Sequence, residues 1–66
     1  MVIILNGEEK TVADDATAAT LIEQLGLTGR RIAMEVNLEI VPRGTFDEHA
    51  LKDGDRVEIV HAIGGG

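Results

Sequence analysis

The pattern of hydrophobic and polar residues predicts a β-hairpin at the start of the chain. Residues 1–5 form a short apolar run rich in β-branched side chains, and residues 8–13 fit a second strand. Asn6-Gly7 lies between the two segments. A tight type I′ turn needs positive φ at both central positions, which Asn and Gly adopt more readily than other residues. The sequence therefore predicts two antiparallel strands joined at this dipeptide.

One amphipathic helix is expected next. Apolar residues recur three, four and seven positions apart, and so lie on one stripe: Ala18, Leu21, Ile22 and Leu25. Thr17 is the expected N-cap, because its hydroxyl can accept a hydrogen bond from an otherwise unpaired backbone N–H. Gly26 fits the position after the last turn, where a left-handed backbone favours a residue without Cβ.

The second half of the chain reads as a short hairpin, a turn and a last strand. Residues 32–36 alternate as a strand, Asn37-Leu38 is the expected turn, and residues 39–41 return until Pro42, which cannot donate to a strand ladder. Three further segments are expected: a short helical turn at 45–51 that carries Phe46 and Leu51 inward, a tight turn at Asp53-Gly54, and a last strand at 56–63.

This order of elements predicts an α+β fold of the β-grasp, or ubiquitin-like, type. One main helix has to cover one face of a mixed sheet of four to five strands, because neither layer can bury its apolar side alone. The last strand is expected at the centre beside the first, so residues 1–63 form the domain and Gly64–Gly66 a flexible tail. The expected core is Ile3, Leu5, Leu21, Ile22, Leu25, Met34, Val36, Val57 and Ile59.

Period-two alternation also predicts the residues of the open face of the sheet. If Ile3 and Val57 face the helix, their neighbours in the sequence face away from it. Because the first and last strands are expected side by side, four apolar residues would form one exposed patch: Val2, Ile4, Val60 and Ala62. An exposed apolar patch rimmed by charge commonly marks a protein interface, although one or two exposed apolar residues are ordinary.

Charge and composition narrow the possible partners. Twelve acidic residues against six basic ones give a formal net charge of −6, and Phe46 is the one aromatic residue. Nucleic-acid binding requires cations against phosphate and aromatic platforms for bases, so nucleic acid and anionic membranes are not expected partners. An acidic domain of this size is expected to dock on a basic protein surface.

Few side chains suggest chemistry of their own. The chain has no cysteine, which suits a reducing cytoplasm, and no carboxylate pair has the marks of a general acid and base. His49 and His61 lack the spacing of a metal site, so we expect none. His61 lies near the tail and is a candidate partner contact. Arg43 can bind a partner or pair with a local acid.

The chain ends in Gly64-Gly65-Gly66 directly after the last predicted strand. Three glycines can be a frayed end. They can also be a working end, because a carboxylate that reaches into another protein's cleft needs neighbours without side chains and with a free choice of φ and ψ. Following a β-grasp strand, the second interpretation is the stronger.

Several segments resemble the sulfur carrier proteins of thiamine thiazole biosynthesis. The matching pieces are AMEVNLEIVPR around Asn37, LKDGDRVEIV before the last strand, and the terminal GGG. The resemblance implies a carrier and not an enzyme. An E1-like adenylating enzyme would activate Gly66 with ATP, and a sulfur donor system would convert the adenylate to a thiocarboxylate for the thiazole synthase. Gly64 and Gly65 would thread the tail into these partners, with no cofactor bound to the chain itself.

Three alternatives remain at this point. The sulfur-carrying subunit of molybdopterin synthase shares the predicted fold and a Gly-Gly end. A ubiquitin-like protein modifier would use the same end for conjugation to lysine. A non-covalent regulatory β-grasp module would have an incidental tail.

Overall fold

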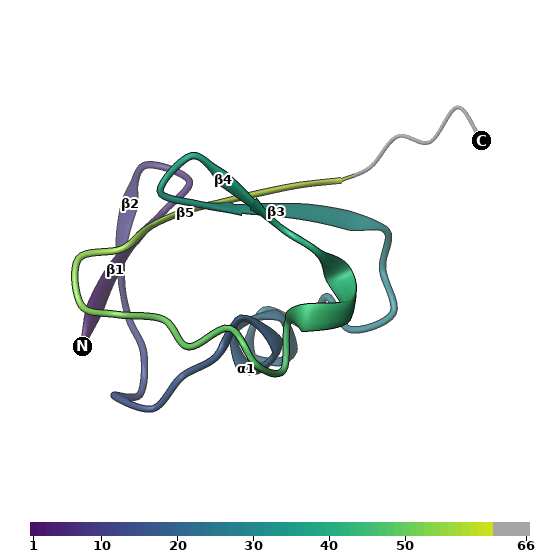
Figure 1. Cartoon of the computed structure of the whole chain (residues 1–66). Helices are drawn as coiled ribbons and strands as arrows, with labels where there is room; N and C mark the ends of the chain where they lie inside the picture. Colours follow the sequence, from purple (N-terminus) through teal and green to yellow (C-terminus); the bar gives the residue numbers. More distant parts are fainter. Residues whose placement is uncertain (62–66) are drawn as a thin grey trace.

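The structure, a computed structural model, describes residues 1–61 of the chain. Five strands form one mixed sheet in the order β2-β1-β5-β3-β4, and helix α1 packs below one face of it (Figure 1). The elements are β1 (Val2–Leu5), β2 (Glu8–Thr11), α1 (Ala18–Gln24), β3 (Ile32–Val36), β4 (Glu39–Val41), the 3₁₀ helix η1 (Arg43–Thr45) and β5 (Arg56–His61). The predicted β-grasp fold is confirmed, with β5 next to β1.

Both hairpins turn at the predicted dipeptides. Asn6 and Gly7 have φ values of 49° and 85°, and Asn37 and Leu38 have values of 52° and 70°. Two consecutive positive values are the signature of a type I′ turn, whose twist matches that of the flanking strands. The first hairpin pairs β1 with β2 and the second pairs β3 with β4, both antiparallel.

Helix α1 has the predicted cap at each end. The Thr20 backbone N–H donates to Thr17 Oγ1 over 3.2 Å, and the Thr17 N–H donates to Thr20 Oγ1 over 2.8 Å. This is a capping box in which threonine takes the place of the usual Glu or Gln. At the other end Gly26 has a φ of 72°, and the N–H of Leu27 donates to the Ile22 carbonyl. The helix therefore closes in a Schellman motif.

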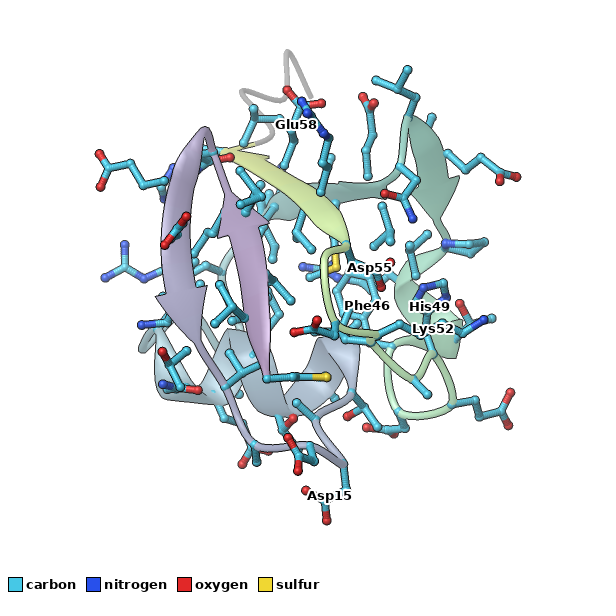
Figure 2. The ribbon with its side chains drawn as sticks, turned by 90° about the vertical axis from the view of Figure 1, so that its left-hand side faces the viewer. Asp15, Phe46, His49, Lys52, Asp55 and Glu58 are labelled. Atoms are coloured by element: carbon cyan, nitrogen blue, oxygen red, sulfur yellow. The ribbon has the colours of Figure 1, made fainter. Side chains whose placement is uncertain are left out.

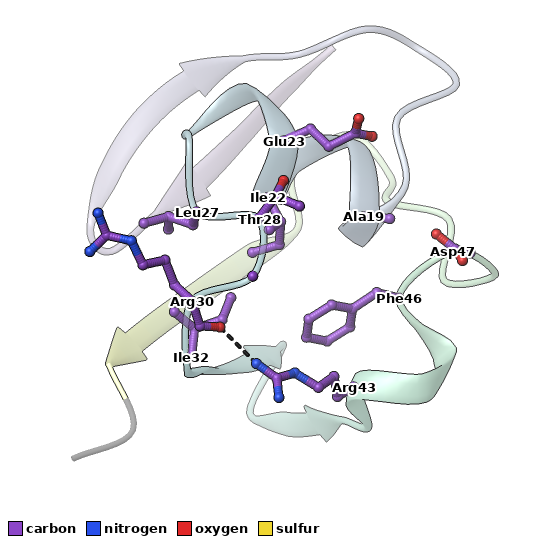
Figure 3. A pocket seen from close by; sticks show the side chains of 11 residues that line it. Ala19, Ile22, Glu23, Leu27, Thr28, Arg30, Ile32, Arg43, Phe46 and Asp47 are labelled. Carbon is purple, nitrogen blue, oxygen red and sulfur yellow. Dashed lines mark hydrogen bonds between the residues drawn. The ribbon is translucent and has the colours of Figure 1, made fainter. Parts of the chain in front are cut away.

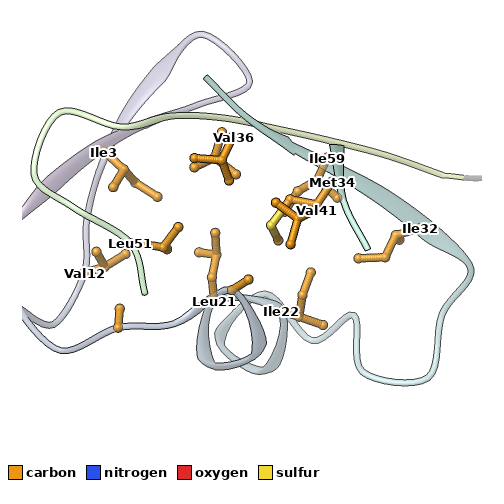
Figure 4. Packing of buried hydrophobic residues seen from close by; sticks show 13 residues of the cluster. Ile3, Val12, Leu21, Ile22, Ile32, Met34, Val36, Val41, Leu51 and Ile59 are labelled. Carbon is orange, nitrogen blue, oxygen red and sulfur yellow. The ribbon is translucent and has the colours of Figure 1, made fainter. Parts of the chain in front are cut away.

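The core fills the space between α1 and the sheet (Figure 4). Most of the predicted core residues are buried, whereas Leu5 and Leu25 lie partly buried at its margin. The expected core list lacked six residues that the structure buries: Val12, Ala16, Ala18, Ile32, Val41 and Leu51. Of these, Ala18 was predicted on the apolar stripe of the helix and Leu51 was predicted to point inward. The deepest side chains, Ile3, Leu21, Met34 and Val57, come from four different elements and hold the helix against the centre of the sheet.

The segment between β4 and β5 differs from its predicted form. The helical turn lies at Arg43–Thr45 and not at 45–51, although Phe46 and Leu51 do point inward. The reason is long-range backbone pairing: Ala18 donates to the His49 carbonyl, and Leu51 donates to the Ala16 carbonyl. These bonds draw the segment along the start of α1, a pairing that local sequence cannot reveal.

The N-terminal ammonium group forms an ion pair with Asp14. The Met1 ammonium lies 2.8 Å from Asp14 Oδ1, and this hydrogen bond holds the pKa of the exposed Asp14 carboxyl below its usual range.

Within residues 1–61, no helix has the length and apolar character needed to cross a membrane.

Candidate functional site: the last strand and the open face of the sheet

Strand β5 leads directly into the predicted tail and lies at the centre of the sheet. It pairs antiparallel with β3 along its length, from Val36 opposite Val57 to Ile32 opposite His61. On its other side it pairs parallel with β1, but only through two partners, of which Leu5 opposite Val57 is the last. The second half of β5 therefore extends beyond the end of β1.

Beyond the end of β1, the Asn6 side chain forms hydrogen bonds with β5. Its Oδ1 accepts the Ile59 N–H at 2.9 Å, and its Nδ2 donates to the Ile59 carbonyl at 3.2 Å. The amide thus gives Ile59 the donor and the acceptor that a neighbouring strand would supply. The sequence predicted a turn at Asn6 and missed this second role, because Ile59 is distant in the sequence.

The start of β5 is held by a buried carboxylate. Asp55 is only 8% exposed, and it accepts the Lys52 N–H at 2.8 Å and the Asn37 Nδ2 at 3.0 Å. Asn37 Oδ1 in turn accepts the Arg56 N–H at 3.0 Å. The turn before β5 and the β3–β4 turn are therefore linked through side chains, which fixes the direction in which β5 runs. The Asp-Gly-Asp sequence signalled a turn and gave no sign of this burial.

The open face carries the predicted apolar residues in a different arrangement. Val2 and Val60 are 37% and 60% exposed, and Ile4 is partly buried. The expectation of one continuous patch is wrong for Ile4 and Val60, which are not neighbours: Ile4 is opposite Arg56, and Val60 is opposite Ala33 on β3. The physical reason is that β1 ends beside Val57, so it does not reach Val60. Ala62, the fourth member of the predicted patch, lies outside the described residues.

Charged residues separate the apolar parts of this face. Glu58 lies between Arg56 and Val60 along β5 and points away from α1 (Figure 2). Glu35 of β3 is its direct cross-strand partner. Like charges directly opposite one another in a sheet destabilise it, so this acidic pair offers a place for a partner's cation.

Two exposed apolar residues of the second hairpin were not predicted as site residues. Leu38 is 83% exposed and Ile40 is 75% exposed. The sequence did contain a signal for Leu38. The second residue of such a turn is usually glycine, as in Asn-Gly, whereas this turn reads Asn37-Leu38.

Arg43 and His61 lie away from the open face. Arg43 Nη2 donates to the Arg30 carbonyl at 2.7 Å, at the rim of a groove of about 290 Å³ lined by α1, the loop after it and Phe46 (Figure 3). The guanidinium thus ties η1 to that loop. His61 is exposed, and alternation places it on the face of β5 that carries Val57 and Ile59, opposite to Val60.

Among residues 1–61, no group of His, Cys, Asp and Glu side chains could hold a metal ion. Gly64, Gly65 and Gly66 lie outside the described residues, so their predicted role stays a prediction.

Comparison with known proteins places this arrangement in a family. The model of the ThiS family matches residues 3–66. The sulfur carrier protein ThiS of Escherichia coli is 33% identical over 66 residues, which cover all of both chains. This chain belongs to the ThiS family. The crystal structure of a thiamine biosynthesis protein (ThiS) from Geobacter metallireducens has the same fold, with a TM-score of 0.87 at 33% identity and full coverage of both chains.

One relative of this ThiS-family chain is much longer. A thiazole synthase of Paramagnetospirillum magneticum is 44% identical over 66 residues, which are all of this chain and 20% of that protein. The chain therefore spans about one fifth of the length of this relative. The predicted family is confirmed.

Proposed function

We propose that this chain is a sulfur carrier for the formation of the thiamine thiazole. The Gly66 carboxylate attacks the α-phosphorus of ATP in an E1-like adenylating enzyme, which releases pyrophosphate and leaves an acyl adenylate. A sulfide equivalent from a sulfur donor system then displaces AMP, and the terminal group becomes a thiocarboxylate. In the thiazole synthase the sulfur passes to the acceptor substrate, an oxygen atom from that substrate or from water takes its place on the acyl carbon, and the carboxylate is regenerated. The chain is a co-substrate in this cycle, and ATP is consumed by its partner.

The observation that carries the proposal is the extent of the family match. It covers residues 3–66, so it includes the three terminal glycines as well as the β-grasp domain. The relative from E. coli, which bears the name sulfur carrier protein, matches this chain end to end. The thiazole synthases that contain a region like this chain support the thiazole synthase as the receiving enzyme.

The described structure suits a carrier whose end works inside another protein. Central strand β5 is held on both sides, by β3 and by the Asn6 amide, so the last strand before the tail has a fixed place in the sheet. Gly64 and Gly65 would thread the tail, since a channel too narrow for side chains admits glycine. The partners would contact the open face at Val2, Ile4 and Val60, with Ala62 as a further expected contact. His61, on the other face of β5, would contact a partner beside the tail.

Intact mass spectrometry tests the proposal. The chain is incubated with ATP, the adenylating enzyme and the sulfur donor system. We expect a mass increase equal to the replacement of one oxygen by sulfur, located at Gly66 by fragmentation and dependent on ATP. An isopeptide-linked ladder would indicate a protein modifier instead. An unchanged mass with active enzymes would indicate a non-covalent module, and either result would refute the carrier function.

A further inference from the structure

Leu38 has a backbone conformation that leucine seldom adopts. It is the second residue of the type I′ turn between β3 and β4, with a φ of 70°. That position is normally glycine, because a Cβ there crowds the following carbonyl oxygen. The other hairpin of the same chain follows the rule, with Gly7 at a φ of 85°. Leucine therefore makes this turn less stable than glycine would.

The Leu38 side chain gives the domain little packing in return. It is 83% exposed, and Ile40, two residues further along, is 75% exposed. The strained backbone lowers the stability of the domain, and an apolar side chain that stays in water does not offset this loss by burial. Strain of this kind persists mainly where it serves a function.

Leu38 forms one wall of a hollow in the open face of the sheet. The hollow has a volume of about 270 Å³, and Ile4 of β1 lines it together with Arg56 and Glu58 of β5. Glu35 lies across from Glu58 and is itself opposite Ile40. The hollow thus combines apolar walls with an acidic margin, where two carboxylates outweigh one guanidinium.

A second copy of this chain is a poor occupant. Each copy has a formal net charge of −6, and two open faces placed together would bring the Glu35 and Glu58 carboxylates of both copies into proximity. A partner with basic side chains around an apolar one matches the charge of this face.

One partner can contact both the hollow and the tail at the same time. The hollow lies beside Arg56 at the start of β5, whereas the tail follows His61 at its other end, and Figure 1 shows the β3–β4 turn and the end of β5 far apart. From Arg56 to His61 there are five steps of about 3.3 Å each, so the two ends of β5 lie roughly 17 Å apart. An ordinary protein interface, which buries about 800 Å² on each side, spans that distance.

We propose that this hollow receives an apolar side chain of the adenylating enzyme, with a basic side chain of that enzyme beside Glu35 and Glu58. The inference rests on the proposed function and adds to it an anchor remote from the reacting carboxylate. Because it is remote, the anchor contributes to association and not to chemistry. A change at Leu38 should therefore raise the KM for the carrier and leave kcat unchanged.

The decisive variant is Leu38→Gly, assayed by ATP–pyrophosphate exchange with the purified adenylating enzyme and by thermal unfolding. We expect a higher melting temperature, because the strain is relieved, and a KM raised about tenfold or more, as for other interface anchors. Leu38→Met is the matched control: it keeps an apolar side chain on the same backbone, so its KM should stay close to that of the wild type. Glu58→Gln should raise KM at low salt and lose this effect at high salt.

Gly7→Ala, which adds only a Cβ, checks the strain itself. A Cβ at Gly7 would have no atom within 4 Å, so a loss of stability there reports backbone strain alone. An unchanged KM for Leu38→Gly, with exchange by the wild type intact, would overturn the inference while leaving the carrier function in place. A fall in kcat at constant KM would also overturn it, as would a wild-type dimer that Leu38→Gly dissociates. Absence of exchange by the wild type would refute the proposed function and this inference with it.

Discussion

At the scale of single residues, two asparagine side chains hold β5 from opposite sides. Asn6 binds both backbone groups of Ile59 from the β1 side, and Asn37 binds the Arg56 N–H from the β3 side. Each amide stands where a strand stops, so it supplies hydrogen bonds that the ladder no longer provides. The register of β5 is fixed in this way, and with it the outward direction of Val60.

Val60→Asp should prevent association with the adenylating enzyme and leave the fold intact. Val60 is 60% exposed, so a carboxylate there stays in water in the free carrier. In a complex the same carboxylate would be buried against an apolar surface without a partner, which is costly. Titration calorimetry measures the loss of binding, and the melting temperature should fall by at most a few degrees.

Val60→Thr is the matched control, because it keeps the β-branched shape without a charge, and it should bind nearly as well as the wild type. Normal binding by Val60→Asp would show that this end of the face is not an interface. Unfolding of Val60→Asp would contradict the outward direction of the side chain.

The residue scale also shows where sequence reasoning stops. The faces of Val2, Ile4 and Val60 followed from alternation alone, because side chains in a strand point alternately up and down. Their spacing along the sheet did not, since it depends on where β1 ends relative to β5. The burial of Asp55 was likewise beyond prediction, because its partner Asn37 belongs to another turn.

At the scale of elements, helix α1 is short and depends on its caps and its buried stripe. Seven residues are too few for a stable helix in water, so packing on the sheet has to stabilise it. The stripe, the N-cap and the closing glycine were all predictable, because each depends on residues within seven positions of one another. The segment from Pro42 to Leu51 was not, since its backbone pairs with Ala16 before the helix and with Ala18 at its start, both distant in the sequence.

Leu21→Ala should cost roughly 2–5 kcal/mol in the free energy of unfolding. Leu21 has no exposed surface and lies where α1 meets the sheet, so the truncated side chain leaves a cavity. A domain of this size has little stability to lose, and the variant should be largely unfolded at moderate temperature. Urea unfolding followed by circular dichroism measures the change.

Leu25→Ala serves as the comparison, because Leu25 packs on the same core but is only partly buried. The free energy of unfolding should fall clearly less in Leu25→Ala than in Leu21→Ala. A loss at Leu21 below about 0.5 kcal/mol would mean that the stripe of the helix does not face the core.

At the scale of the whole molecule, the fold and the proposed chemistry are separable. The described core lies within residues 1–61, and all of its members precede the glycines. Changes to the tail should therefore alter function at constant stability, which is the opposite of the effect expected at Leu21.

Two changes at Gly66 test this separation. An alanine added after Gly66 moves the carboxylate outward and places a Cβ beside it, and deletion of Gly66 withdraws the carboxylate by about 3.3–3.6 Å. Displacement of a reacting atom by about 1 Å can cost on the order of a hundredfold in rate. Both variants should melt like the wild type and lose ATP–pyrophosphate exchange with the adenylating enzyme. The deletion is the milder change, because Gly65 still supplies a glycine carboxylate, and wild-type exchange by both variants would show that the three glycines are a frayed end.

The central position of β5 has a consequence for synthesis on the ribosome. The strand that joins the β1–β2 hairpin to the β3–β4 hairpin is the last of the described elements to be translated. Until Arg56–His61 have left the exit tunnel, the nascent chain holds two hairpins without the strand between them, and isolated two-stranded hairpins are marginal in water. Pairing β5 with β1 closes a loop of some fifty residues, so the native sheet can form only late. A truncated product that ends before β5 should remain unfolded and open to proteolysis, so incomplete chains would be removed before they could occupy a partner.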